Sequence, residues 1–310
     1  MKKIAAVIVT FNRIGKLKRT VQASLSESFS DIVIVNNAST DETKAWLDSL
    51  KDPRLHLLHL PENIGGAGGF HKGFKYVADT LVSDWLVCYD DDAYPQRGAI
   101  EQFLQMKLDN DVASAAAAVY LPNGSICSMN IPRYNPFTSL KFYVEDSAHQ
   151  QADQLTIDMS SFVGYFIKVS LIREEQYFPK KDLFIYADDL IYSLYWTQKG
   201  YKHLFIPQIK FIHDTETLEN TDEGIYAPLW KVYYTFRNGI ELYRNMNRLS
   251  VYPYAIAKYL QLFLQTKKYP KDLQASYRKL IHMAFFDGLK RDYSKSFDQI
   301  RECAKSKTSQ

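Results

Sequence analysis

Three successive aspartates stand where carboxylates could hold a metal ion. Asp90, Asp91 and Asp92 directly follow the apolar run 85–89. Their mutual repulsion favours a neighbouring cation, and carboxylate oxygens suit Mg²⁺ or Mn²⁺, which often bind substrate phosphates at the same time. Asp90 and Asp92 could approach one ion together. A solvated acidic turn is the alternative, and the position after an apolar run favours the metal site.

One histidine has a comparable position. His213 follows the apolar stretch 205–212. A lone histidine is more often structural or solvated than a metal ligand. Its place after a predicted strand makes metal ligation a candidate role, and an imidazole ligand favours Mn²⁺ over Mg²⁺.

A second acidic pair could carry acid–base chemistry. Asp188 and Asp189 precede an apolar run with helical spacing. Asp188 is the better candidate for a helix cap, and Asp189 could accept a proton from an attacking hydroxyl as a general base. Two structural aspartates are the alternative, because acidic residues at helix starts are common.

A glycine-rich segment could bind phosphate or a sugar hydroxyl. It contains four glycines within five positions, as Asn63, Ile64, Gly65, Gly66, Ala67, Gly68, Gly69, Phe70. Glycine permits positive φ and close backbone approach, and amides that open a helix favour anions. A flexible turn is the alternative. The segment lacks the Gly-Lys-Ser/Thr of a P-loop and does not follow the first strand, as a Rossmann fingerprint would.

Two aromatic residues beside Gly164, Tyr165 and Phe166, are candidates for a floor on which a sugar stacks. Most aromatic side chains in a domain of this size belong to the core. The core is therefore the alternative position for both.

The elements that must position these residues form a βαβ pattern. Segments with helical spacing separate the apolar runs 4–9, 32–35, 55–58 and 85–89. This alternation is typical of a parallel sheet, in which ligands bind at the carboxyl ends of the strands. The polar and glycine-rich residues that follow the four runs should therefore meet at one edge. The pattern is irregular over 122–154, returns at 159–169, 183–200 and a strand at 202–206, and is mainly helical from 226 onward.

Composition narrows the function class. The chain has 310 residues, a formal net charge of +3 and three scattered cysteines, which support neither a disulfide framework nor a zinc site and fit a reducing cytoplasm. So small a net charge fits a nucleic-acid-binding protein poorly. The apolar run 4–9 is too short for a signal peptide or membrane span. Cations that could meet acidic lipid gather late in the chain, at Lys267, Lys268, Lys271, Arg278 and Lys279.

Taken in order, these motifs resemble family 2 glycosyltransferases of the GT-A fold, from Ala5 to about Asn238. The loop 9–13 looks like the opening nucleotide-binding segment, and 36–41 looks like the segment that contacts base and ribose. The triple aspartate resembles the metal-binding DxD motif, and Asp188-Asp189 resembles the motif that carries the base. Arg237-Asn238 resembles a pair found late in several bacterial members.

Within that family, the glycine-rich segment, the triple aspartate and His213 are similar to galactofuranosyltransferases, and rhamnosyltransferases share much of the pattern. The resemblance implies that Asp90, Asp92 and His213 hold Mn²⁺ or Mg²⁺ and that Asp189 is the base. The remaining predicted substrate-binding residues are Thr10, Arg13, Asn37, Asn63, Gly65, Gly66, Asp91, Tyr165, Phe166 and Asp188.

Two positions depart from the family pattern. Tyr165 and Phe166 stand where the subgroup has tryptophans, and Asn36-Asn37 stand where the wider family usually has an aspartate. An asparagine carbonyl can still accept a hydrogen bond from a pyrimidine N3–H.

The resemblance implies an inverting enzyme that moves galactofuranose from UDP-galactofuranose onto a hydroxyl of a cell-surface glycan or lipid-linked saccharide. A rhamnosyltransferase using dTDP-rhamnose is the alternative, followed by a nucleotidyltransferase and a non-catalytic sugar-nucleotide-binding protein. We expect a GT-A α/β domain over 1–224, with a nucleotide-binding half (1–115) and an acceptor-binding half (116–224), and a helical region over 225–310. The expected location is the cytoplasm. The helical region could make peripheral contact with the inner face of the membrane, and a packed helical cap is the alternative.

Overall fold

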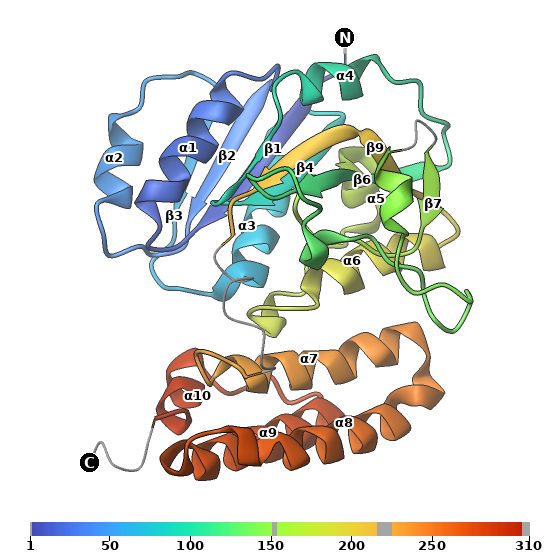
Figure 1. Ribbon diagram of the computed structural model, residues 1–310. Helices are drawn as coiled ribbons and strands as arrows, with labels where there is room; N and C mark the ends of the chain where they lie inside the picture. The colour runs from blue at the N-terminus through green and yellow to red at the C-terminus, as the bar shows by residue number, and fades with distance from the viewer. Residues whose placement is uncertain (1, 151–153, 216–224, 306–310) are drawn as a thin grey trace. The chain divides into compact units, whose positions relative to one another are not determined.

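A computed structural model describes residues 2–150, 154–215 and 225–305 (Figure 1). The chain divides into two compact units. The first comprises Met1–Lys181 and Asp188–Thr215, and the second comprises Asp182–Ala187 and Glu216–Gln310. The predicted domain boundary between residues 224 and 225 falls at the end of a stretch outside the described residues.

The first unit is built on a mixed β-sheet. Its strands run in the order β3-β2-β1-β4-β8-β6-β9-β5, and β7 also pairs with β9. The neighbours β3, β2, β1 and β4 are parallel, which confirms the predicted βαβ arrangement. The strand bounds are β1 Ile4–Thr10, β2 Asp31–Asn36, β3 Leu55–His59, β4 Trp85–Asp90, β5 Ala93–Pro95, β6 Val112–Tyr120, β7 Leu155–Ile157, β8 Tyr165–Lys168 and β9 Lys202–His213.

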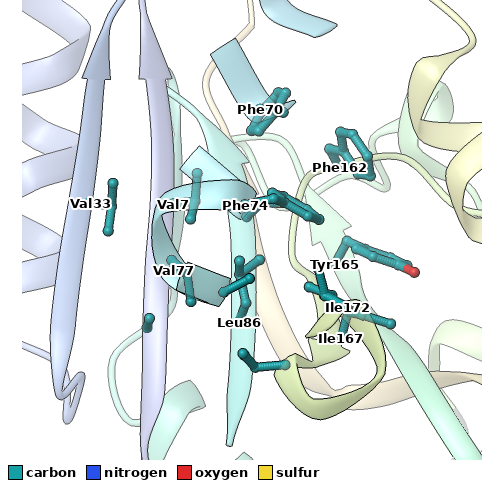
Figure 2. Close-up of a cluster of buried hydrophobic side chains, with 14 of the residues drawn as sticks. Val7, Val33, Phe70, Phe74, Val77, Leu86, Phe162, Tyr165, Ile167 and Ile172 are labelled. Carbon is teal, nitrogen blue, oxygen red and sulfur yellow. The ribbon is translucent and has the colours of Figure 1, made fainter. Parts of the chain in front are cut away.

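Helices cover both faces of the parallel strands. Figure 2 shows Phe70, Phe74 and Val77 of one helix facing Val7 and Leu86 of the sheet. On the other face, the Ser24 hydroxyl lies 2.7 Å from the Tyr89 hydroxyl, so α1 packs there. The helices of this unit are α1 Ile14–Leu25, α2 Thr43–Ser49, α3 Gly65–Thr80, α4 Ala99–Gln105, α5 Val169–Glu175 and α6 Asp188–Gln198.

The second unit is helical, as the pattern from residue 226 predicts. It contains α7 Lys231–Met246, α8 Val251–Gln265, α9 Lys271–Lys290 and α10 Phe297–Cys303, with α7, α8 and α9 packed together (Figure 1). Buried side chains from these helices, among them Tyr233, Ile240, Tyr277 and Leu280, form its core. Among the described residues, no helix is long and apolar enough to cross a membrane.

The short segment Asp182–Ala187, from the middle of the chain, also belongs to this helical unit. The Asn238 side chain donates to the carbonyls of Leu183, Ile185 and Tyr186 at 3.0, 2.6 and 3.0 Å. Arg237 donates to Leu183 as well, at 2.9 Å. Arg237 and Asn238, the pair singled out in the sequence, are thus buried side chains that donate hydrogen bonds to the backbone carbonyls of this segment.

Candidate functional site

The acidic turn and His213 meet because two strands pair beyond the end of β4. Strand β5 runs antiparallel to β9 with Ala93 opposite His213, and the Asp214 amide donates to the Asp92 carbonyl at 2.8 Å. The side-chain ligand atoms of Asp90, Asp92 and His213 all lie within 4.8 Å of one another. These three residues therefore form a candidate metal centre.

The donor set fits a divalent cation. Two carboxylates and an imidazole are ligands that Mn²⁺ accepts, and Mg²⁺ accepts the carboxylates. The Asp92 carboxylate accepts hydrogen bonds from Arg13 at 2.5 Å and from His213 Nε2 at 3.2 Å. Asp92 is only 4% exposed, so its charge needs positive partners close by.

The pKa values of the three aspartates and His213 are shifted because these groups are buried close to one another. Burial, and next the charge of Asp92, raise the pKa of Asp90 to about 6 and that of Asp91 to about 7. Burial also acts to raise the pKa of Asp92, but His213 and Arg13 together hold it below its usual value. Burial acts to lower the pKa of His213, but the hydrogen bonds to Asp92 and Cys127 and the charges of Asp92 and Asp90 together raise it to about 10.

Asn130 sets the orientation of the His213 ring. Its side-chain oxygen lies 2.8 Å from His213 Nδ1, and its amide nitrogen donates to Ser161 at 2.8 Å. With Nδ1 held as a donor, Nε2 is directed at Asp92, and it would bind a metal in place of the proton that it donates there. The sequence analysis missed Asn130, because it lies in the irregular stretch 122–154, where no periodic pattern marks it.

Asp188 and Asp189 open α6 and share the electrostatic environment of the acidic turn. Burial, and then the charge of Asp189, raise the pKa of Asp188 well above its usual value. Burial also raises the pKa of Asp189, which the Leu190 amide, donating at 2.7 Å, and the charge of Arg133 partly offset. Arg133 is a second residue from the irregular stretch that sequence reasoning missed.

Arg13, one of the predicted donor-binding residues, remains accessible at this edge. Its guanidinium contacts Asp92 and lies 3.7 Å from Asp91, while 43% of its side chain is exposed. A cation with that freedom can pair with a phosphate as well as with a carboxylate.

The predicted substrate contacts of Thr10 and Asp91 stay predictions, and both side chains are engaged with other protein groups in this structure. Thr10 is 1% exposed, and its hydroxyl donates to the Asp91 carboxylate at 2.8 Å. The same carboxylate accepts from the Phe11 amide, and Asp91 is 5% exposed. These two side chains hold the end of β1 against the acidic turn and present almost no surface to a ligand.

Asn37 likewise positions the glycine-rich segment, and its predicted contact with a donor stays a prediction. It is 2% exposed, its amide donates to Asn63 at 2.9 Å and to the Gly65 carbonyl at 3.0 Å, and its oxygen accepts from the Ile64 amide. Asn63 and Gly66 are partly exposed and stay candidates. Gly65 is buried, but its φ of +76° explains why glycine stands there.

The comparisons with known proteins decide the family. The model for "Glycosyl transferase family 2" matches residues 5–170, which is more than half of the chain. The chain belongs to glycosyl transferase family 2. A curated relative, an undecaprenyl-phosphate mannosyltransferase of Micrococcus luteus, is 28% identical over 128 residues, which cover 40% of this chain. The match spans 51% of that relative's length.

Solved structures of glycosyltransferases share the fold. TarS 1–349 of S. aureus superposes with a TM-score of 0.54 at 13% identity, over 97% of this chain and 90% of that one. The mannosyltransferase PcManGT of Pyrobaculum calidifontis, in complex with GDP-Man and Mn²⁺, gives a TM-score of 0.56 at 14% identity, over 94% and 88% of the two chains. The predicted GT-A fold is thereby confirmed.

In this family 2 enzyme, part of the glycine-rich segment serves packing. A β-carbon at Gly69 would lie 2.5 Å from the Val9 side chain, and one at Gly68 would lie 2.7 Å from Ile64. At Gly66 a β-carbon would meet nothing within 4 Å. Gly68 and Gly69 therefore let α3 lie close to its neighbours. At the start of the helix, the Ile64 and Gly65 amides donate to the side-chain oxygens of Asn37 and Asn63, and Gly66 is the partly exposed position there.

The prediction that Tyr165 and Phe166 form a sugar-stacking floor is wrong. Tyr165 is 0% and Phe166 1% exposed, because they lie on adjacent positions of β8 and point into the cores on opposite faces of the sheet. Figure 2 shows Tyr165 within the cluster beneath α3. Phe166 stacks on Phe103 of α4 at a centroid distance of 4.0 Å.

Proposed function

We propose that this family 2 glycosyltransferase moves a sugar from a nucleotide-diphosphate donor to an acceptor hydroxyl in a single, inverting displacement. The observation that carries the proposal is the gathering of Asp90, Asp92 and His213 within 4.8 Å at the carboxyl ends of the strands. Asp188 and Asp189 lie close enough to Asp90 for their charges to affect one another. One group of carboxylates can hold a cation while another accepts a proton.

Donor binding would use the edge of the parallel strands. Asp90, Asp92 and His213 would hold Mn²⁺ or Mg²⁺, which when bound supplies charge neutralisation for the departing diphosphate. The partly exposed Arg13 guanidinium can pair with a phosphate oxygen, and the positive end of the α3 helix dipole favours negative charge. PcManGT was solved with GDP-Man and Mn²⁺, which supports a similar pairing of donor and metal here.

Asp189 would act as the general base. Burial raises its pKa and so makes the carboxylate more basic, while Arg133 favours its charged form. It would take the acceptor hydroxyl's proton as the oxygen attacks the anomeric carbon opposite the leaving diphosphate, which inverts that centre. Asp188, at 7% exposed, stays a candidate support for this base.

For the donor we retain UDP-galactofuranose, with dTDP-rhamnose as the second candidate. The support is the pattern of the glycine-rich segment, the triple aspartate and His213. The burial of Tyr165 and Phe166 removes aromatic stacking from that support. Because the curated relative is a mannosyltransferase, GDP-mannose belongs in any donor test.

For the acceptor we propose a hydroxyl of a growing cell-surface glycan or a lipid-linked saccharide, reached at the cytoplasmic face of the membrane. The support is the curated relative, an undecaprenyl-phosphate mannosyltransferase.

A donor panel tests the proposal. Purified protein would be incubated with UDP-galactofuranose, dTDP-rhamnose, GDP-mannose and other UDP-sugars, with Mn²⁺ or with EDTA, in the presence of a lipid-linked saccharide extract. We expect Mn²⁺-dependent release of a nucleoside diphosphate together with a glycosylated product of inverted configuration. Release of pyrophosphate would instead indicate a nucleotidyltransferase, and donor binding without any release would indicate a non-catalytic protein.

A further inference from the structure

One side of the second unit exposes a continuous apolar stripe. Apart from the adjacent Phe263 and Leu264, its residues recur every three or four positions, so they lie on one face of α8 and the turn before it. Their exposed fractions are 88% for Leu249, 66% for Tyr252, 52% for Ile256, 56% for Leu260, 46% for Phe263 and 77% for Leu264. The outward face of a surface helix normally carries polar residues, so this stripe calls for a partner.

The neighbouring helix extends the apolar surface. A groove of about 220 Å³ lies between α8 and α9, lined by Ile256, Tyr259, Leu260, His282, Phe285 and Phe286. Phe286 is itself 42% exposed. We name the stripe together with this groove the α8–α9 face.

Positive charge borders the α8–α9 face. Residues 251–290 contain seven lysines and arginines against two aspartates, whereas the whole chain has a net charge of only +3. Lys267, Lys268 and Lys271 are exposed at the connection between α8 and α9. Arg278 is exposed four residues before His282, and His282 four residues before Phe286, so this cation shares the outward side of α9.

We propose that the α8–α9 face docks the protein on an anionic lipid membrane. Interfacial helices place large apolar side chains in the acyl boundary while flanking lysines and arginines meet the head groups. Each cation near an anionic leaflet adds to that attraction. A two-fold dimer through the same face would instead bring the cations of both copies into one interface, which is unfavourable.

Flotation of the full chain tests this proposal without any donor or acceptor, so its outcome is independent of the proposed transferase activity. We expect the protein to float with phosphatidylcholine vesicles that contain phosphatidylglycerol, to bind pure phosphatidylcholine much less, and to be released by added salt. The double variant Leu260→Glu/Leu264→Glu should weaken binding by at least about tenfold, because charge then replaces apolar contact. The double variant Lys267→Ser/Lys268→Ser should weaken binding by about tenfold or more.

A matched control comes from the first unit, where Val82 is 78% and Leu140 108% exposed. The variant Val82→Glu/Leu140→Glu should float like the unaltered protein. Circular dichroism and thermal melting would verify that each variant is folded. Absence of flotation, equal binding to neutral vesicles, or equal loss in the control would overturn the proposal. So would a dimer that Leu260→Glu/Leu264→Glu dissociates in sedimentation while no sample floats.

Discussion

At the scale of single residues, the site is a set of charges that compensate one another. Asp92 pairs with Arg13 and His213, and His213 is in turn oriented by the side-chain oxygen of Asn130. Side chains that orient a metal ligand commonly affect metal affinity almost as strongly as the ligand does. Asn130, which would not touch the metal or substrate, is therefore a testable positioning residue.

Replacing Asn130 by alanine should weaken Mn²⁺ binding by about 10- to 100-fold, because the His213 ring loses the partner that fixes its orientation. Electron paramagnetic resonance of free Mn²⁺ measures this directly. Asn110→Ala, at an exposed position, is the matched control and should leave the affinity unchanged. An unaltered affinity in Asn130→Ala would remove the positioning role.

The raised pKa of Asp189 predicts the acid limb of the pH–rate profile. Burial is the main cause, and Arg133 opposes it. A general base must be deprotonated, so activity is lost as pH falls through this raised pKa, above the ordinary aspartate value of about 4. Arg133→Ala should move the limb to higher pH, since it removes the charge that lowers the pKa. A limb that moves equally in the exposed Arg97→Ala control, or not at all in Arg133→Ala, would contradict the assignment.

At the scale of elements, α3 packs so closely on the sheet that it requires a glycine at position 73. A β-carbon at Gly73 would lie 2.3 Å from the Val7 side chain and 3.3 Å from Val35. Both neighbours are fully buried core residues and have little room to move. The glycine is thus required by packing, about two turns after Gly65, where α3 begins.

Gly73→Ala should lower the free energy of unfolding by about 1–3 kcal/mol through overpacking, as measured by chemical denaturation. Gly15→Ala is the matched control in another helix, where a β-carbon meets nothing within 4 Å. Alanine there should be neutral or stabilising by up to about 1 kcal/mol. Equal effects of the two substitutions would show that the backbone preference of glycine, and not close packing, decides both.

The same elements show what sequence reasoning can reach. Apolar runs predicted β1 to β4 within a residue or two, because a strand buried on both faces consists largely of apolar residues. Strand β6 was missed, since Val112–Tyr120 is mostly alanine, which has little strand preference of its own. Its identity as a strand comes from pairing with β8 and β9, which are distant in sequence.

Within the site, the sequence predicted which residues lie near the acidic cluster better than it predicted what each side chain contacts. The cluster of Asp90, Asp92 and His213 follows from strand ends, which a sequence displays. Thr10 and Asn37 also lie at strand ends, yet their side chains face other protein groups, and only the structure shows which way they point. Asn130 and Arg133 come from an irregular stretch whose path depends on tertiary contacts.

At the scale of the whole molecule, chemistry and charge are divided between the two units. The first unit carries the acidic cluster, and the second carries the cations around the α8–α9 face. A net charge of +3 conceals this division, because the seven cations and two aspartates of 251–290 exceed the total on their own. The rest of the chain is therefore slightly acidic, although the function that we propose requires it to bind an anionic donor.

Because the net charge outside residues 251–290 does not attract an anionic donor, local cations must neutralise the donor at the site. The central claim is that they do so and that Asp189 takes the acceptor's proton. The most direct measurement is the rate of Mn²⁺-dependent nucleoside diphosphate release from the preferred donor in the presence of acceptor, compared between the unaltered protein and Asp189→Asn, with Asp109→Asn as the exposed control. The account predicts a rate about 10²- to 10⁴-fold lower in Asp189→Asn, with donor affinity and the control rate unchanged. A near-normal rate in Asp189→Asn would contradict it.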